Sequence, residues 1–589
     1  MIDSGEGPSR RGARRAAEQG SPWQPAPDGW PQEPGALWRA RFRTYGEGRS
    51  LSVSDVAAAP AEQCRVHPVS AALAGLAGDR LLIATIIVAL TFSSVQWATP
   101  NIIGIDGYFH IKFAQLIREQ GWRMLLPIEF PWLQLTILNP AEYTNHHLLF
   151  HLLLTPFTLG DLRIGAKLAP VVFASGALLV AYQLMVEHRV RYPLLWLVVM
   201  LASSGPFLYR LSQTRRQSLT LLLLLLALYL AFKGRGRWLV PLGFAFIWLF
   251  DGFPLLLGVC GAAFLGDWWG RRRPNWGLVL YPALGVLLGT VVNPYFPNNV
   301  QFSYLHMLPK VLQLVGIDHA DTPIQVGNEW YPYSRDFLWR ANWLAILLVP
   351  AGLLPLALDA RPSRLRAVDG KVIALGIVAL TFLVLFLRSR RWIEAEPVFA
   401  TLFCAFAWSR AMPDRITDLF RSHVSQMRRQ RLALAGVALA TVAVLVQLNA
   451  SVTAAMNDTR STRDYTRYRA GAQWLAANTP DGARVFATDW DDFPELFFWN
   501  THNTYLIGLD PTYMYLYDGP LYLQWRAITR GQVERPGALI RDVYGAGWVF
   551  TDHAHRDFLR QAAEDPELVE VFRDNQVILF AVRGWQPAP

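Results

Sequence analysis

Long apolar runs alternate with short polar segments through the middle of the chain. A helix needs about 20 apolar residues to cross a hydrocarbon core about 30 Å thick, and eleven runs approach that length. They lie at 81–98, 164–186, 193–209, 218–232, 237–250, 253–266, 276–293, 342–358, 371–387, 393–409 and 432–449. The pattern predicts a polytopic α-helical membrane protein with about 11 transmembrane helices. A shorter apolar run at 147–159 predicts an interfacial helix in a loop.

The two ends of the chain lack such runs. Residues 1–78 are rich in Pro, Gly, Ala, Arg and Glu and show no apolar periodicity, which predicts a disordered tail. Residues 451–589 alternate between helix-like and strand-like segments, which predicts a small α/β domain. The expected helices are 469–477, 520–529 and 558–564, and the expected strands are 484–488, 547–551 and 576–582. We therefore expect a tail, a membrane domain at 79–450 and a C-terminal domain at 451–589.

Basic residues in the short loops predict the orientation. Lys and Arg accumulate in cytoplasmic loops, and with a cytoplasmic N-terminus every basic short loop but two lies inside. Two long loops, 99–163 and 294–341, and the C-terminal domain are then extracytoplasmic. We expect a multi-pass protein of the inner, cytoplasmic membrane.

The amino-acid composition agrees with a membrane protein and argues against other classes of protein. The 589 residues are 52% hydrophobic and 17% charged, against about 25% charged residues in soluble proteins. The net charge is +10, but no long basic run is interleaved with aromatic residues, so we expect no nucleic-acid partner. The three Cys have neither C-x-x-C nor zinc-ligand spacing.

The two basic loops that face outward predict an anion site. One is Arg215-Arg216, between the third and fourth spans, and the other is 388–391, between the ninth and tenth. The planar guanidinium fork matches phosphate oxygens. The alternatives are anchoring to lipid headgroups or pairing with nearby Glu394 and Glu396. The candidate phosphate ligands are Arg215, Arg216, Arg390 and Arg391.

Carboxylates in the outer loops are candidates for acid–base chemistry. Asp106 precedes a helix-like segment at 108–119 and is either a general base, a metal ligand or a helix cap. Glu329 lies among aromatic residues in the second long loop and is a second candidate acid or a solvated carboxylate. Asp251, at the hairpin between the fifth and sixth spans, is either functional or simply solvated.

Histidines and a late acidic motif complete the candidates. His147 and His151 are four residues apart, a spacing that can bind a metal, although hydrogen bonding to a substrate or interfacial packing is the simpler interpretation. The segment 487–500 carries Trp490, Asp491 and Asp492 after an expected strand. It forms either a polar recognition surface or a strand end with buried aromatics.

This arrangement resembles the glycosyltransferase C (GT-C) superfamily, and most of all the catalytic subunit of oligosaccharyltransferases. The resemblance matches Asp106, in Asp-Gly-Tyr-Phe-His110, with the catalytic Asp of the first outer loop. It matches Glu329 with a Glu of a late outer loop, Arg390 or Arg391 with an Arg at the next membrane edge, and 488–494 with a Trp-Trp-Asp motif. Two departures are clear: the loop from 210 to 218 holds no acid where those enzymes have an Asp-x-Asp-like pair, and the late motif reads Asp-Trp-Asp.

The resemblance implies a glycosyltransferase whose donor is a sugar linked to polyprenyl phosphate or pyrophosphate in the membrane. The arginines would hold the phosphate, and Asp106 would take the acceptor proton or orient the acceptor, assisted by Glu329 and His110. The acceptor, a protein, glycan or lipid, would contact the C-terminal motif and His147. Whether Asp106 and Glu329 also bind a divalent cation, Mg²⁺ or Mn²⁺, is left open by the resemblance. The alternative function is a transporter or flippase of lipid-linked glycans.

Overall fold

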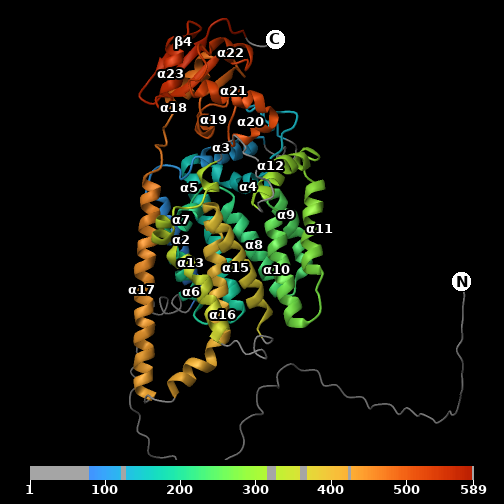
Figure 1. Ribbon diagram of the computed structural model, residues 1–589, viewed down its shortest axis with the longest axis vertical. Helices are drawn as coiled ribbons and strands as arrows, with labels where there is room; N and C mark the ends of the chain where they lie inside the picture. Colours follow the sequence, from blue (N-terminus) through green and yellow to red (C-terminus); the bar gives the residue numbers. More distant parts are fainter. Residues whose placement is uncertain (1–78, 121–127, 315–326, 359–367, 422–425, 587–589) are drawn as a thin grey trace, which may run out of the picture. The chain divides into compact units, whose positions relative to one another are not determined.

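The computed structural model describes residues 79–120, 128–314, 327–358, 368–421 and 426–586 (Figure 1). The expected disordered tail at 1–78 lies outside the described residues and stays a prediction. Helices make up most of the described chain up to residue 460, and those of the predicted spans come first. They are α2 (Arg80–Gln96), α5 (Leu162–Glu187), α6 (Pro193–Ala202), α7 (Gly205–Leu211), α8 (Gln217–Phe232), α9 (Leu239–Leu249), α10 (Pro254–Arg271), α11 (Gly277–Val291), α13 (Arg335–Leu358), α15 (Gly370–Arg388), α16 (Glu396–Arg421) and α17 (Gln426–Arg460).

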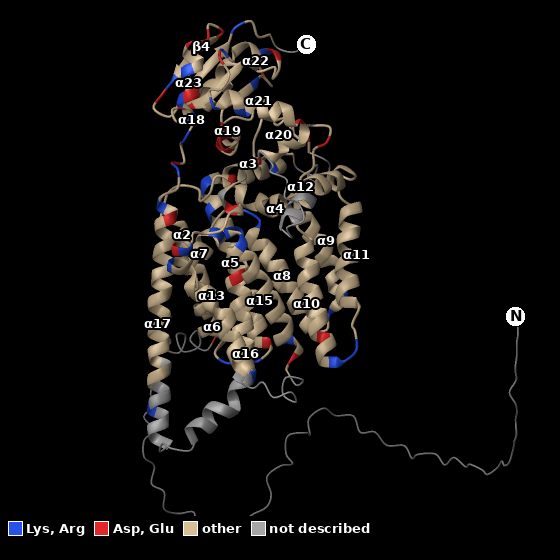
Figure 2. Ribbon diagram, viewed as in Figure 1, with Lys and Arg blue, Asp and Glu red and all other residues tan. Residues whose placement is uncertain are grey.

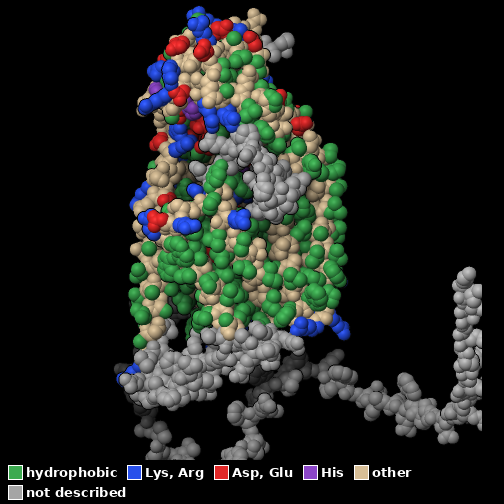
Figure 3. All heavy atoms as spheres, viewed as in Figure 1, with side chains coloured by type: hydrophobic (Ala, Val, Ile, Leu, Met, Phe, Trp, Pro, Cys, Tyr) green, Lys and Arg blue, Asp and Glu red, His purple; other side chains and the backbone are tan. Residues whose placement is uncertain are grey.

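Several of these helices have the length and apolarity of membrane spans. Among the described residues, four are long and apolar enough to cross a bilayer: α5, α13, α15 and the second part of α17. A fifth is obtained if α6 and α7, which bend by 91° at their junction, form one span. The expected count of eleven stays a prediction. Apolar side chains cover much of the visible face of the helical part (Figure 3), and charged residues lie mostly at helix ends (Figure 2).

Short helices lie in the predicted outer loops. The first loop contains α3 (Asp106–Glu119), α4 (Leu148–Leu154) and the 3₁₀ helix η2 (Thr155–Thr158). The apolar run at 147–159 is therefore helical, as expected. The second loop contains α12 (Asn298–Leu314) and the 3₁₀ helix η4 (Asn328–Trp330), and a third 3₁₀ helix, η5 (Arg390–Glu394), follows α15. These elements carry five of the eleven predicted site residues: Asp106, His110, Glu329, Arg390 and Arg391.

The C-terminal residues form a five-stranded sheet with the order β2-β1-β3-β5-β4. Strands β1 (Arg484–Ala487), β3 (Trp548–Asp552) and β5 (Val577–Val582) were expected from the sequence, whereas β2 (Thr504–Tyr505) and β4 (Leu568–Arg573) were not. β1 pairs in parallel with β2 and β3, and β5 pairs antiparallel with β3 and β4. The accompanying helices are α18 (Arg469–Asn478), α19 (Phe493–Trp499), α20 (Thr512–Tyr517), α21 (Gly519–Thr529), α22 (Gly537–Asp542) and α23 (Arg556–Ala563).

The sheet is tied to the first outer loop through backbone and side chains. Leu133 forms a parallel bridge with Tyr505, and the Tyr505 amide donates to the Trp132 carbonyl at 2.7 Å. One apolar cluster joins Phe113 and Phe130 of the loop to Phe497 of α19. Since an apolar core excludes water and resists displacement, these contacts hold α19 against α3. The strand end that carries Trp490 is thereby fixed beside Asp106.

Candidate active site

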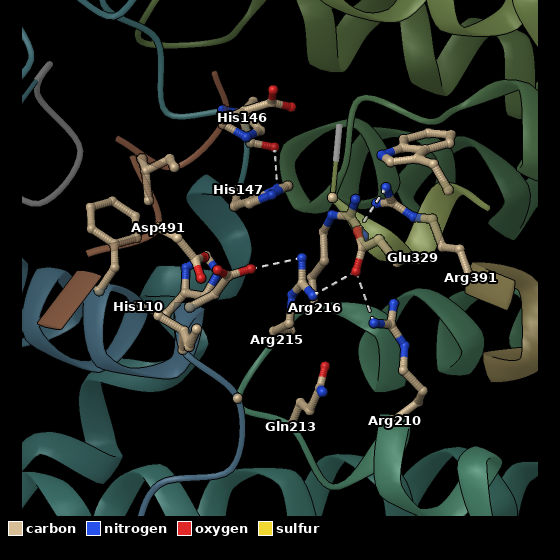
Figure 4. A pocket seen from close by; sticks show the side chains of 18 of the residues that line it. His110, His146, His147, Arg210, Gln213, Arg215, Arg216, Glu329, Arg391 and Asp491 are labelled. Carbon is tan, nitrogen blue, oxygen red and sulfur yellow. Dashed lines mark hydrogen bonds and ion pairs between the residues drawn. The ribbon is translucent and has the colours of Figure 1, made fainter. Parts of the chain in front are cut away.

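One cavity of about 570 Å³ collects almost all of the residues singled out from the sequence. Its wall is built from the first outer loop, the turn between α7 and α8, the segments around η4 and η5, and the C-terminal domain. Ten of the eleven predicted site residues line it: Asp106, His110, His147, Arg215, Arg216, Glu329, Arg390, Arg391, Trp490 and Asp491. Asp492 does not line the cavity. Segments that are hundreds of residues apart thus meet at one site (Figure 4).

Two glycines allow Asp106 to approach the turn between α7 and α8. Gly104 has φ +80°, and a Cβ there would meet the Gln213 side chain at 3.3 Å. A Cβ on Gly107 would lie 2.9 Å from Ile102 and 3.2 Å from Thr214. Only glycine combines a positive φ with such close packing at low cost. The sequence Gly-Ile-Asp-Gly therefore places the Asp106 carboxylate directly against the turn.

The Asp106 side chain forms an ion pair and does not cap α3. Its Oδ2 lies 2.7 Å from Nη2 of Arg215. The residue before the helix is Ile105, and no side chain caps this end. The alternative that Asp106 is a helix cap is therefore wrong, because the carboxylate turns toward the arginine turn instead of the backbone amides of α3.

Glu329 is the centre of an arginine cluster. Its Oε2 accepts from Nη1 of Arg210 at 2.9 Å and from Nη1 of Arg215 at 3.1 Å, while its Oε1 lies 3.3 Å from Nη1 of Arg391. Burial alone would raise the pKa of Glu329, but the guanidinium groups of Arg215, Arg210 and Arg391 hold the pKa well below its usual value. Glu329 is therefore ionised at neutral pH and is not a solvated loop carboxylate.

The four predicted phosphate ligands have different partners. Arg215 and Arg391 are bound to carboxylates, and Arg390 donates from Nε and Nη2 to the carbonyls of Tyr331 and Pro332, both at 3.1 Å. Arg216 forms no ion pair with any carboxylate in the described ranges. It stacks over the Phe250 ring at 3.5 Å, and burial, followed by repulsion from Arg391, lowers its pKa to about 9. It therefore stays a cation at neutral pH, with no carboxylate at ion-pair distance in the described ranges.

The alternative of arginine pairing with Glu394 and Glu396 holds only for Glu394, and with an arginine of the first basic motif instead of the 388–391 cluster. Glu394 instead pairs with Arg210 at 3.2 Å, across 184 residues of sequence. Glu396 is fully buried, and neither of its carboxylate oxygens has a hydrogen-bond partner among the described residues. The short 3₁₀ helix η5 directs Arg391 toward Glu329 and leaves Glu394 facing α7.

The histidines form a buried, uncharged group. Nδ1 of His110 lies 2.9 Å from Nε2 of His151, whose Nδ1 lies 2.9 Å from the Asn145 side-chain oxygen. Burial, with the arginines and the other histidines, lowers the pKa of both His110 and His147 well below the usual value. Neutral rings can donate or accept hydrogen bonds to a polar substrate. His147 is the residue before α4, and His151 lies in the last turn of this short helix.

The late acidic motif divides between the cavity and the core. Asp491, on the 3₁₀ helix η6 (Trp490–Asp492), faces the cavity and pairs with Arg463 at 3.4 Å. Burial raises the pKa of Asp491 to about 6, against the opposing effect of Arg463. Asp492 is 2% exposed and has its nearest basic partner, Arg467, at 3.9 Å. We assign Asp492 to the domain core, where it cannot reach a ligand in the cavity.

Sequence reasoning missed Arg210 and His306 among the cavity residues and left Asp251 unassigned. Arg210 is the first residue of the same polar motif as Arg215, and this shared motif was the available signal. Asp251 lies 3.3 Å from Nδ1 of His306, and Nε2 of His306 lies 3.8 Å from Asp510. Asp251 is 3% exposed and therefore not the solvated hairpin residue of the simpler interpretation. His306 of α12 thus lies between Asp251 of the α9–α10 hairpin and Asp510 of the C-terminal domain.

The carboxylates at the centre of the cavity do not present a vacant metal-ligand set. Arg215 lies between Asp106 and Glu329 and bonds to both. Within the described part of the chain, no group of three or more His, Cys, Asp or Glu side chains is arranged to hold a metal ion. The donor atoms that a divalent cation prefers, carboxylate oxygens, are here bound to guanidinium groups.

The fold is similar to that of solved oligosaccharyltransferases, which agrees with the resemblance seen in the sequence. It is similar to the archaeal oligosaccharyltransferase AglB from Archaeoglobus fulgidus, solved with an inhibitory peptide and a dolichol-phosphate. The TM-score is 0.57, the sequence identity is 12%, and the match covers 87% of this chain and 75% of that chain. An oligosaccharyltransferase structure from the same organism, tethered to an acceptor peptide containing an NVT sequon, has TM-score 0.54, 13% identity and the same coverage. ArnT from Cupriavidus metallidurans, bound to undecaprenyl phosphate, has TM-score 0.48, 16% identity, and covers 86% of this chain and 99% of that one. Neither a family model nor a curated relative matches the sequence.

Proposed function

We propose that the protein is a membrane glycosyltransferase that moves a sugar or oligosaccharide from a polyprenyl-(pyro)phosphate donor to an acceptor on the extracytoplasmic face. The observation that supports it is the convergence, in one cavity, of Asp106, the arginine cluster and the Trp490–Asp491 motif. The fold likeness to an oligosaccharyltransferase solved with a dolichol-phosphate agrees with a lipid-linked donor. We place the protein in the inner membrane, with the N-terminus cytoplasmic.

The donor phosphate is proposed to bind on the arginine side of the cavity. Arg216 is the natural first contact, because its charge is not neutralised by a carboxylate. The charge of Arg391 is close enough to repel that of Arg216, and Arg391 forms an ion pair with Glu329. Preorganised cations at the position where a leaving phosphate gains negative charge stabilise the transition state. The arginines thus bind the donor and favour departure of the polyprenyl phosphate.

The acceptor is proposed to enter on the other side, between Asp106 and Asp491. In Figure 4, Asp491 and His110 lie on one side, Glu329, Arg391 and Arg210 on the other, and Arg215 and Arg216 between them. The Asp106 carboxylate orients the acceptor group and removes its proton as the bond to the sugar forms. Trp490 and Asp491 contact the acceptor, and His147 and neutral His110 offer further hydrogen bonds. The acceptor itself is a protein, glycan or lipid.

The assay of this proposal is transfer of a lipid-linked glycan by purified protein in detergent. We expect Asp106→Asn to lower the transfer rate by about 10²-fold or more, the usual worth of a general base, with normal expression and unfolding temperature. Asp161→Asn is the matched control. Asp161 is an exposed cap in the same loop whose side chain accepts from two backbone amides of α5, and Asn caps equally well. Full transfer by Asp106→Asn would overturn the assignment.

A strain that lacks the protein separates transfer from transport. Loss of a transferase leaves its lipid-linked donor on the outer face, with no modified acceptor. Loss of a flippase leaves the same donor on the inner face. Accumulation of donor that is accessible to externally added enzyme supports the transferase, and accumulation of protected donor contradicts it.

A further inference from the structure

The two carboxylates at the centre of the cavity share one guanidinium group. Asp106 Oδ2 lies 2.7 Å from Nη2 of Arg215, and Glu329 Oε2 lies 3.1 Å from Nη1 of the same side chain. A divalent cation that bridged both acids would have to lie between them, where the guanidinium group of Arg215 now lies. We propose that Arg215 takes the position of such a cation, so that this site acts without a divalent metal. The proposal rests on the glycosyltransferase function proposed above.

The charges around the site favour an anion over a second cation. Three guanidinium groups, those of Arg210, Arg215 and Arg391, bind Glu329. The carboxylates in contact with this group are also three, Asp106, Glu329 and Glu394, so these charges cancel. Arg216, beside Phe250, and Arg390, bound only to backbone carbonyls, keep positive charges that no carboxylate pairs with among the described residues, although Asp251 and Asp491 also line the cavity. On this arginine side a dication would add to the positive charge, whereas a phosphate would offset it.

Both oxygens of Glu329 are already engaged. Oε2 accepts from two arginines and Oε1 faces a third, at distances from 2.9 to 3.3 Å. A metal ion would need a free carboxylate lone pair and would displace at least one of these charge-assisted contacts. Arg215, in contrast, is covalently part of the site and stays charged at every physiological pH.

The local sequence explains why an arginine can occupy this position. The turn between α7 and α8 contains no acid from 205 to 218, so it supplies no further carboxylate for a metal. It supplies Arg215 instead, and Thr214 anchors the turn by donating to the Ala166 carbonyl at 2.5 Å. Gly107 packs against Thr214 and brings Asp106 within reach. The guanidinium therefore holds Asp106 in one orientation and presents positive charge to the donor.

The test measures Mn²⁺ binding to the full chain in detergent micelles with no donor present. Electron paramagnetic resonance of the free ion reports how much Mn²⁺ is bound. We expect the wild type to bind no Mn²⁺ at the site. Arg215→Gln keeps a polar side chain but removes the guanidinium group that binds Asp106 and Oε2 of Glu329. We expect this variant to bind one Mn²⁺, and we expect the double variant Arg215→Gln/Asp106→Asn to lose it. The control is Arg560→Gln, which also breaks an Arg–Asp pair, with Asp557 on the surface, and should gain none.

A transfer assay with excess chelator provides the second measurement. We expect the wild-type rate to be unchanged by chelator, and Arg215→Gln to lose about 10²-fold in rate and to recover part of it with Mn²⁺. One Mn²⁺ bound by the wild type and lost in Asp106→Asn would overturn the proposal, as would a chelator-sensitive rate or failure of folded Arg215→Gln to bind Mn²⁺. If that variant does not fold, the wild-type measurements decide. Absence of any transfer would refute the glycosyltransferase function, while the Mn²⁺ titration would still decide the role of Arg215.

Discussion

Removing the charge of Glu329 should destabilise the folded protein strongly. Glu329→Gln keeps the shape of the side chain but leaves the guanidinium groups of Arg210, Arg215 and Arg391 without their shared counter-ion. The side chains of this cluster are only 12–23% exposed, so water would screen the unpaired positive charges poorly. Breaking a buried ion pair by removal of one partner costs about 3–5 kcal/mol, and we expect a loss in that range.

The pH dependence of this loss has a definite sign. The pKa of Glu329 is held well below its usual value in the folded protein by Arg215, Arg210 and Arg391, against the effect of burial. A depressed carboxyl pKa stabilises the fold fully above the unfolded-state value of about 4.3, and the contribution is lost as pH falls from there through the folded value. The wild type and Glu329→Gln should therefore differ most at neutral pH and converge in acid.

The assay is tryptophan-fluorescence unfolding in detergent micelles at a series of pH values. Glu564→Gln, an exposed residue after α23, is the control and should change stability by less than about 0.5 kcal/mol. A loss for Glu329→Gln of under about 1 kcal/mol, the value of a surface ion pair, would refute the reasoning. So would a difference from the wild type that does not depend on pH.

Three further substitutions test separate parts of the site. Arg216→Gln should raise the KM for the lipid donor about 10- to 100-fold, since it removes a charge-assisted contact worth about 1.5–3 kcal/mol, and an unchanged KM would contradict phosphate binding there. Because the pKa of Asp491 is raised to about 6 by burial, kcat/KM should fall as pH drops through that value, and Asp491→Asn should abolish this acid limb. Lys167→Met should lower kcat more than it raises KM, because Lys167 donates at 2.9 Å to two backbone carbonyls just before Asp106; equal effects on donor binding and turnover would refute this positioning role.

Local features of the fold could be predicted from the sequence, whereas pairings across the chain could not. The helix at 108–119 and the strands at 484–488 and 547–551 follow from short-range periodicity and turn residues, and the structure contains them. β2 is only two residues long and has no periodicity to detect. Its partner in the first outer loop, Leu133, is far away in sequence. Strand recognition from periodicity therefore fails where a strand is held by tertiary contacts alone.

The candidate site shows the same division. Residue type and membrane sidedness were enough to single out Asp106 and Arg215 as polar groups at the outer membrane edge. Sequence could not show that they bind each other, or that Glu394 pairs with Arg210 and not with its neighbour Arg391. Such ion pairs depend on how helices far apart in sequence pack. Arg210 was overlooked because its partners lie 119 and 184 residues away.

The distribution of charges also explains how the residues that line this cavity can keep their arrangement without a ligand. Five arginines line it, and their mutual repulsion would be costly if they were left bare. Glu329 and Glu394 offset Arg210 and Arg391, and Asp106 offsets Arg215. Arg390 is satisfied by backbone carbonyls. Arg216, stacked on the Phe250 ring, and Arg390 keep charges that no carboxylate pairs with among the described residues. Internal carboxylates thus hold most of the arginines in place and leave positive charge for an incoming anion, which is the arrangement that the proposed preorganised donor site requires.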